Sequence, residues 1–71
     1  MSDFPTLQQE IDRKSNVMLT ELVQHLRKKT MSKEDIIFKA EVIWHCYSGL
    51  ITNNDGFMEI VDEIKREANQ L

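Results

Sequence analysis

The sequence contains one cysteine, one proline and two glycines among its 71 residues. A single thiol, Cys46, cannot form a disulfide within the chain. A core of this size rarely supplies more than ~3–5 kcal/mol of net stability, so a metal or a second copy of the chain is the reinforcement that the composition leaves open. A chain without a disulfide framework suits a reducing compartment, and we expect a cytoplasmic protein.

Long apolar runs and an excess of positive charge are also missing. No segment approaches the ~18 consecutive apolar residues of a membrane span, and residues 1–5 lack the basic start of a signal peptide. We therefore expect an intracellular chain that does not enter membranes. Nine Lys and Arg stand against twelve Asp and Glu, a formal net charge of −3. This balance argues against non-specific nucleic-acid binding, because cations must neutralise the phosphates.

What the sequence does have is helical periodicity. Hydrophobic residues make up 41% of the chain, enough for one folded domain over residues 1–71. Apolar residues recur at three- and four-residue steps in three segments, about 5–29, 33–50 and 55–70. Short connections between them favour antiparallel neighbours. The sequence predicts an all-α fold, a small three-helix bundle. Its long N-terminal helix can extend beyond the others, leaving apolar surface that homodimerisation could cover.

Each segment has signals at its ends and an apolar stripe. Pro5 suits the first turn of a helix, Ser32 with Asp35 resembles a capping box, and residues 53–55 can cap the third helix. Ser15 falls in the first stripe, which indicates close packing or a hydrogen bond back to its helix. The stripes consist of Leu7, Ile11, Ser15, Met18, Leu19, Leu22, Val23 and Leu26; then Ile36, Ala40, Ile43, Tyr47 and Leu50; then Phe57, Ile60, Val61, Ile64, Ala68 and Leu71.

The second segment has an additional apolar patch. At 100° per residue, Phe38 and Val42 point roughly opposite the main stripe, and Cys46 lies between the two faces. One interpretation places Phe38 and Val42 inside the bundle, between the first and third helices. The other makes these three residues a protein interface, because aromatic side chains are enriched at such contacts. The sequence leaves both interpretations open.

The only concentrated positive charge is Arg27, Lys28 and Lys29, with Lys33 beyond the next turn. These four residues could contact phosphate, and the segment 28–35 has the outline of a helix-turn-helix. The following helix, however, opens with two acids, and its faces carry apolar residues instead of the Arg, Asn or Gln that read bases. Compensation of the helix dipole explains the same cluster.

Residues 52–64, TNNDGFMEIVDEI, resemble the second half of an EF-hand calcium loop. With Gly56 at loop position 6, position 1 is Ile51, which offers no oxygen, and position 12 is an aspartate in place of the usual glutamate. A turn and a helix cap explain the same letters without a metal. The resemblance implies four candidate ligands in a degenerate calcium sensor: Asn53, Asp55, Glu59 and Asp62.

The remaining chemistry-bearing residues do not form a site. His45 and Cys46 are adjacent, so on a helix they point about 100° apart and do not converge on one ion. We find no catalytic constellation, and we expect neither an enzyme nor a bound cofactor or metal. The leading prediction is a self-associating protein–protein interaction module, an adaptor, inhibitor or regulator. The alternatives are a nucleic-acid-binding regulator and the degenerate calcium sensor.

Overall fold

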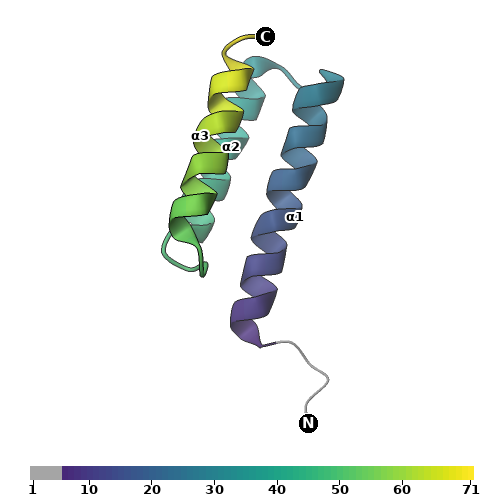
Figure 1. Cartoon of the computed structure of the whole chain (residues 1–71). Helices are drawn as coiled ribbons and strands as arrows, with labels where there is room; N and C mark the ends of the chain where they lie inside the picture. The colour runs from purple at the N-terminus through teal and green to yellow at the C-terminus, as the bar shows by residue number, and fades with distance from the viewer. Residues whose placement is uncertain (1–5) are drawn as a thin grey trace.

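The computed structural model describes residues 6–71 and contains three helices (Figure 1). They are α1 (Leu7–Lys28), α2 (Lys33–Tyr47) and α3 (Asn54–Ala68), and no strand occurs in this range. Successive helices run in opposite directions, and α2 packs against both of the others. The predicted all-α three-helix bundle is confirmed. The predicted helix start at Pro5 lies outside the described residues.

Helix α1 begins with a capping box that was not predicted from the sequence. The Thr6 hydroxyl accepts a hydrogen bond from the backbone N–H of Gln9 (3.1 Å), and the Gln9 side-chain oxygen accepts one from the Thr6 N–H (2.9 Å). The helix ends at Lys29, whose φ of 55° is left-handed. The Lys29 N–H donates to the carbonyls of His25 and Leu26. This left-handed residue closes α1 without the glycine that such caps usually use.

Helix α2 starts where the sequence predicts but ends earlier. The Ser32 hydroxyl accepts from the backbone N–H of Asp35 at 3.2 Å, which is one half of the predicted capping box. The helix stops at Tyr47 and does not reach Leu50. Gly49 takes a φ of 80°, a conformation that reverses the chain and that glycine adopts without strain. Leu50 therefore leaves the predicted stripe and is 53% exposed.

The core lies where the three stripes meet. The stripe residue Ser15 is buried, and its hydroxyl donates to the carbonyl of Asp12 at 2.8 Å, as its position in the stripe predicts. Trp44 and Tyr47 are half-buried against Phe57, with ring centroids 5.9 and 6.4 Å from it. The buried apolar residues are Leu19, Leu22, Leu26, Ile36, Ala40, Ile43, Phe57, Val61, Ile64 and Ala68.

Residues near the ends of the stripes are more exposed than predicted. Leu7 is 78% and Leu71 50% exposed, and Ile60, at the edge of the α3 stripe, is 45% exposed. Helix α1 has 22 residues against 15 in each of the others, so it is ~33 Å long against ~22 Å. Its first turn extends past the α2–α3 turn, which leaves Leu7 without an apolar neighbour to cover it (Figure 1).

None of the three helices in residues 6–71 combines the length and the apolar character needed to cross a membrane.

Candidate protein-interaction surface

Helix α2 has two apolar faces that point in opposite directions. Its inner face holds Ile36, Ala40 and Ile43, each with 0% of its surface exposed. Phe38 and Val42 lie two residues before and after Ala40, so the 100° step per residue turns both away from the core. Their exposed fractions are 71% and 40%. The chain alone does not bury this pair between α1 and α3, so their interpretation as internal core does not hold.

A shallow hollow of about 330 Å³ lies beside this exposed pair. Its lining is completed by Met31, from the turn before α2, and by the side chains of Asp35 and Lys39. Aromatic and methionine side chains bordered by charged groups are typical of protein–protein contacts. We call these five residues, Met31, Asp35, Phe38, Lys39 and Val42, the α2 outer surface.

Cys46 lies one turn beyond Val42 and is exposed. It therefore continues the outer surface along the helix. The neighbouring His45 side chain is 76% exposed, and its Nε2 lies 3.6 Å from a carboxylate oxygen of Glu41. His45 and Cys46 are neighbours in the helix, so their side chains leave it about 100° apart. Within residues 6–71, no three or more His, Cys, Asp or Glu side chains are grouped so that they could hold a metal ion.

The charges around the outer surface differ in whether they already have partners. Lys65 of α3 donates to Glu41 of α2 at 2.6 Å. This hydrogen bond, with the attraction of the same ammonium group, lowers the pKa of Glu41 below its usual value. Asp35 and Lys39, in contrast, take part in no ion pair among residues 6–71. The outer surface therefore has one charge of each sign available to a partner.

The predicted basic cluster surrounds the α1–α2 turn but does not form one site. Arg27, Lys28, Lys29 and Lys33 are all exposed. Arg27 lines a hollow between α1 and α3 that also includes Ile60, whereas Lys29 and Lys33 line a different hollow. The four cations therefore do not converge on one hollow that could hold a phosphate. Arg27 and Lys28 lie in the last turn of α1, where cations favour the negative end of the helix dipole.

The EF-hand-like segment is a turn and the first half of α3. The side-chain oxygen of Asn53 accepts from the backbone N–H of Gly56 at 3.0 Å, which caps the helix. Asn54 uses its side-chain oxygen to accept from the N–H of Gly49 at 2.8 Å. From Asn54 onward the backbone is helical, so the twelve-residue loop conformation is not adopted. Asp55, Glu59 and Asp62 are exposed on α3.

Gly56 follows three turn-forming residues in the sequence, but it does not take the left-handed conformation that glycine permits in a turn. It lies inside α3, and Gly49 is the glycine with positive φ. A Cβ at Gly56 would approach the Asn53 side-chain nitrogen to 2.6 Å. Gly56 therefore leaves room for the capping side chain that folds over it.

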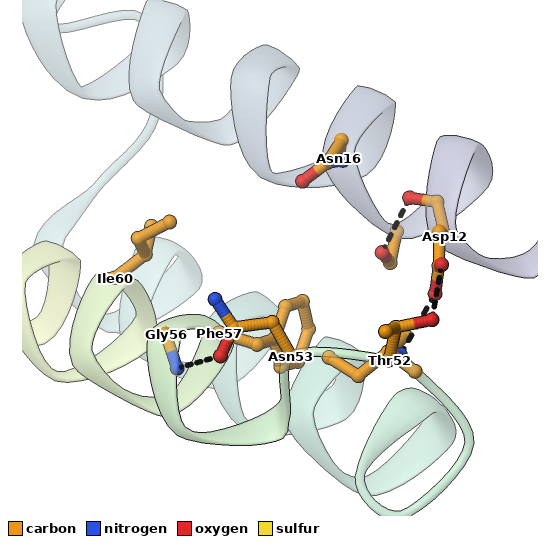
Figure 2. Close-up of a pocket in the computed structure, with 9 residues that line it drawn as sticks. Asp12, Asn16, Thr52, Asn53, Gly56, Phe57 and Ile60 are labelled. Atoms are coloured by element: carbon orange, nitrogen blue, oxygen red, sulfur yellow. Dashed lines mark hydrogen bonds between the residues drawn. The ribbon is translucent and has the colours of Figure 1, made fainter.

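A further hollow, a cleft of about 260 Å³, lies between α1 and the turn that leads into α3 (Figure 2). One Asp12 carboxylate oxygen accepts from the Thr52 N–H (3.0 Å) and from the Gln8 amide (2.9 Å). The other accepts from the Thr52 hydroxyl at 2.7 Å. The Gln8 amide also donates to the carbonyl of Leu50 at 2.9 Å. We call Gln8, Asp12 and Thr52 the α1–turn clamp, because they fasten α1 to the α2–α3 turn.

The α1–turn clamp is a structural contact. Two hydrogen bonds from Thr52 lower the pKa of Asp12 below its usual value. The bond from the Thr52 side chain has the larger effect and the bond from its backbone N–H the smaller. Both carboxylate oxygens accept hydrogen bonds from the chain itself, and these bonds join α1 to the α2–α3 turn. The clamp was not predicted because Asp12 and Thr52 are 40 residues apart and carry no local signal of pairing. The contribution of Met31, Asp35 and Lys39 to the outer surface was not predicted either.

No family model, curated protein or solved structure matches this chain.

Proposed function

We propose that this chain is a small protein–protein interaction module that binds its partner through the α2 outer surface. The observation that carries the proposal is the 71% exposure of Phe38 at the middle of a helix whose opposite face is fully buried. A single exposed apolar residue needs no explanation. Here an aromatic and a β-branched side chain lie one turn apart beside a hollow, and a contiguous apolar patch is a feature of binding surfaces.

Burial of the Phe38 and Val42 side chains would supply most of the binding free energy of such a contact. Complete burial of a Phe or Val side chain is worth roughly 1.5–3 kcal/mol, and a few anchors of this kind supply most of the affinity of an interface. Phe38 and Val42 would be these anchors. Asp35 and Lys39 lie beside them without partners among residues 6–71, and charges in this position select partners and fix their orientation.

A photo-crosslinking experiment tests the proposal. p-Benzoylphenylalanine, a phenylalanine whose ring carries a photoreactive benzoyl group, replaces Phe38 in the expressed protein, and crosslinked products are identified by mass spectrometry. A matched control carries the same group at Val17, which is 44% exposed on α1. We expect a defined protein product from position 38 that is absent from position 17. The identified protein is then purified and its Kd for the chain is measured directly.

Two double variants then test whether the identified protein binds at the α2 outer surface. Phe38→Asp with Val42→Asp should weaken this Kd at least tenfold, because two acids replace both anchors. Val17→Asp with Met58→Asp changes two residues of similar exposure, 44% and 42%, on other helices, and should leave the Kd unchanged. Equal products from positions 38 and 17, or equal effects of the two double variants, would contradict a docking role for the α2 outer surface.

A further inference from the structure

A groove runs between α1 and α3, away from the α2 outer surface. The cleft beside the α1–turn clamp and the hollow that Arg27 lines each measure about 260 Å³, and they share two lining residues, Asn16 of α1 and Ile60 of α3. Asn16 and Ile60 come from opposite sides of the cleft (Figure 2). Of the residues that the structure describes, none from α2 lines either hollow. We call the two hollows together the α1–α3 groove.

The floor of the α1–α3 groove is apolar and has the length of a short helix. Leu19 and Phe57 are buried in it, whereas Ile60 keeps 45% of its surface exposed. The floor stays open because α3 packs less closely on α1 than on α2. The lining residues of α1 extend from Asp12 to Arg27, a length of ~22 Å. An amphipathic helix that binds in such a groove lays its apolar side chains on the floor.

The edge of the groove that α1 forms is uncharged along most of its length. Asn16, Thr20 and Gln24 recur at four-residue steps, line the groove and are exposed. Charged lining residues of α1 occur only at the two ends of the groove, where Asp12 belongs to the α1–turn clamp and Arg27 lies near the end of the helix. A partner therefore meets neutral polar groups along this edge.

The edge that α3 forms is acidic. Glu59, Glu63 and Glu67 recur at four-residue steps and are exposed, so they form a ridge along one side of the helix. A hollow next to the groove is lined by Glu59 and Glu63 together with Ile60, which places this glutamate ridge beside the floor. Glu63 pairs with Arg66, but Glu59 and Glu67 form no ion pair among residues 6–71. This edge therefore has negative charge available to a partner.

We infer that the α1–α3 groove binds an amphipathic helix of a second protein, with lysine or arginine side chains along one side of its apolar face. The apolar face covers Leu19, Val23 and Ile60, and the cations lie against the glutamate ridge. Like charges across a contact repel each other, so the ridge disfavours an acidic helix. The groove and the α2 outer surface share no lining residue, so this binding does not depend on the proposed function.

A pair of synthetic peptides tests the charge preference. Both have about 15 residues, which as a helix match the length of the groove, and both carry leucines at three- and four-residue steps. One has lysines along one side of the leucine face, and the other has glutamates there. We expect fluorescence anisotropy to give the lysine peptide a Kd at least ~10-fold lower. Equal Kd values, or no binding of the lysine peptide at ~1 mM chain, would overturn the inference.

Amide chemical shifts of the ¹⁵N-labelled chain identify where the lysine peptide binds. We expect the largest changes at Asn16, Thr20 and Ile60, which line the groove. Changes centred on Phe38 and Val42 would place the peptide on the α2 outer surface instead. In that case the inference falls and the proposed function stands.

Two triple variants separate a contact at the ridge from general attraction to an acidic chain. Replacement of the three ridge glutamates, Glu59→Gln, Glu63→Gln and Glu67→Gln, should raise the Kd of the lysine peptide about 10-fold. The control removes the same formal charge at exposed positions that line neither the groove nor the hollow next to it: Glu21→Gln, Glu34→Gln and Asp55→Asn. The control should leave the Kd unchanged. Equal effects of the two triple variants would contradict binding at the ridge.

Two single variants test the floor of the groove. Ile60→Ser removes the exposed apolar side chain and should raise the Kd about 5-fold. Met58→Ser is the matched control, because Met58 is 42% exposed on the same helix and, two residues away, points ~200° from Ile60. Circular dichroism verifies that both variants keep their helices. If the two variants bind the lysine peptide equally well, Ile60 does not contact it and the inference is overturned.

Discussion

Ile43 and Phe38 lie on the same helix, but only Ile43 is buried by the chain itself. We expect Ile43→Ala to lower the free energy of unfolding by ~2–5 kcal/mol, because it leaves a cavity in the core. Phe38→Ala should change it by no more than ~0.5 kcal/mol. Urea denaturation followed by circular dichroism measures both values. A loss for Phe38→Ala as large as that for Ile43→Ala would place Phe38 in the core and contradict the α2 outer surface.

Gly49 has a left-handed backbone conformation that a residue with a side chain adopts only with strain. Its φ is 80°, and no heavy atom lies within 4 Å of the place a Cβ would occupy, so only conformational strain opposes a side chain. Gly49→Ala should lower the free energy of unfolding by ~1–2 kcal/mol. Gly49→Asn should lower it less, because Asn tolerates left-handed backbone. Equal losses in denaturant titrations would show that φ is not the cause.

Gly49 and Gly56 show which features of the α2–α3 turn could be predicted from the sequence and which could not. Both lie in a stretch rich in turn-forming residues, so a reversal of the chain between residues 48 and 56 was predictable. Which of the two glycines takes the left-handed conformation was not predictable, because Asn53 and Asn54 can each cap the third helix. Asn53 takes the cap and Asn54 bonds back to Gly49. That choice depends on how the turn packs as a unit.

At the scale of a helix, the start of α3 depends on one side chain. Asn53→Ala removes the acceptor for the Gly56 N–H and should cost ~0.5–2 kcal/mol of unfolding free energy. Asn69→Ala is the matched control. Asn69 is an exposed residue at the other end of α3, and its backbone, not its side chain, makes the cap contacts. Thermal melts of both variants provide the comparison. Similar shifts in Tm would mean that the Asn53 cap does not stabilise α3.

The helices themselves were predictable, and their ends were less so. Apolar residues repeat at helical spacing over most of each segment, and this pattern needs no knowledge of the other helices. The ends depend on partners that a stripe does not reveal. Leu50 continues the stripe of α2 by spacing, but the chain turns at Gly49 first. Leu7 continues the stripe of α1, but no helix extends far enough to cover it.

At the scale of the whole molecule, the α1–turn clamp joins α1 to the rest of the bundle and makes stability depend on pH. The pKa of Asp12 is lowered below its ordinary value of 3.8 by Thr52, so the folded chain favours the ionised carboxylate. Its contribution is complete above the unfolded pKa and is lost as the pH falls through the folded value. We expect the unfolding free energy to decrease below about pH 4. Glu10 and Glu41, whose pKa values are also lowered, contribute in the same direction.

Asp12→Asn isolates the contribution of Asp12. This variant should be less stable than the unchanged chain at pH 7 and should lose less stability on acidification, because residue 12 no longer takes up a proton. Glu21→Gln, at an exposed position of α1, is the control. Urea denaturation at pH 7 and pH 3 measures the difference. Parallel losses for the unchanged chain and Asp12→Asn would show that Asp12 does not cause the pH dependence.

Long-range contacts mark the limit of what the sequence could reveal about the candidate site. The two apolar faces of α2 were predictable from spacing, and so were Phe38, Val42 and Cys46 as residues of the outer one. Their exposure was not, because a third helix on that side would have covered them. The placement of Met31 beside Phe38 and the pairing of Asp12 with Thr52 depend on the packing of elements distant in sequence.

Because the inner face of α2 packs in the core, the helix backbone beneath its outer surface is held in place by the chain itself. Ala40 and its buried neighbours hold the helix from behind, and their amide hydrogens should exchange with solvent only when the whole chain unfolds. A partner would therefore order side chains but not backbone, which keeps the entropic cost of association low. Binding should proceed at the rate of docking two rigid surfaces, without a folding step.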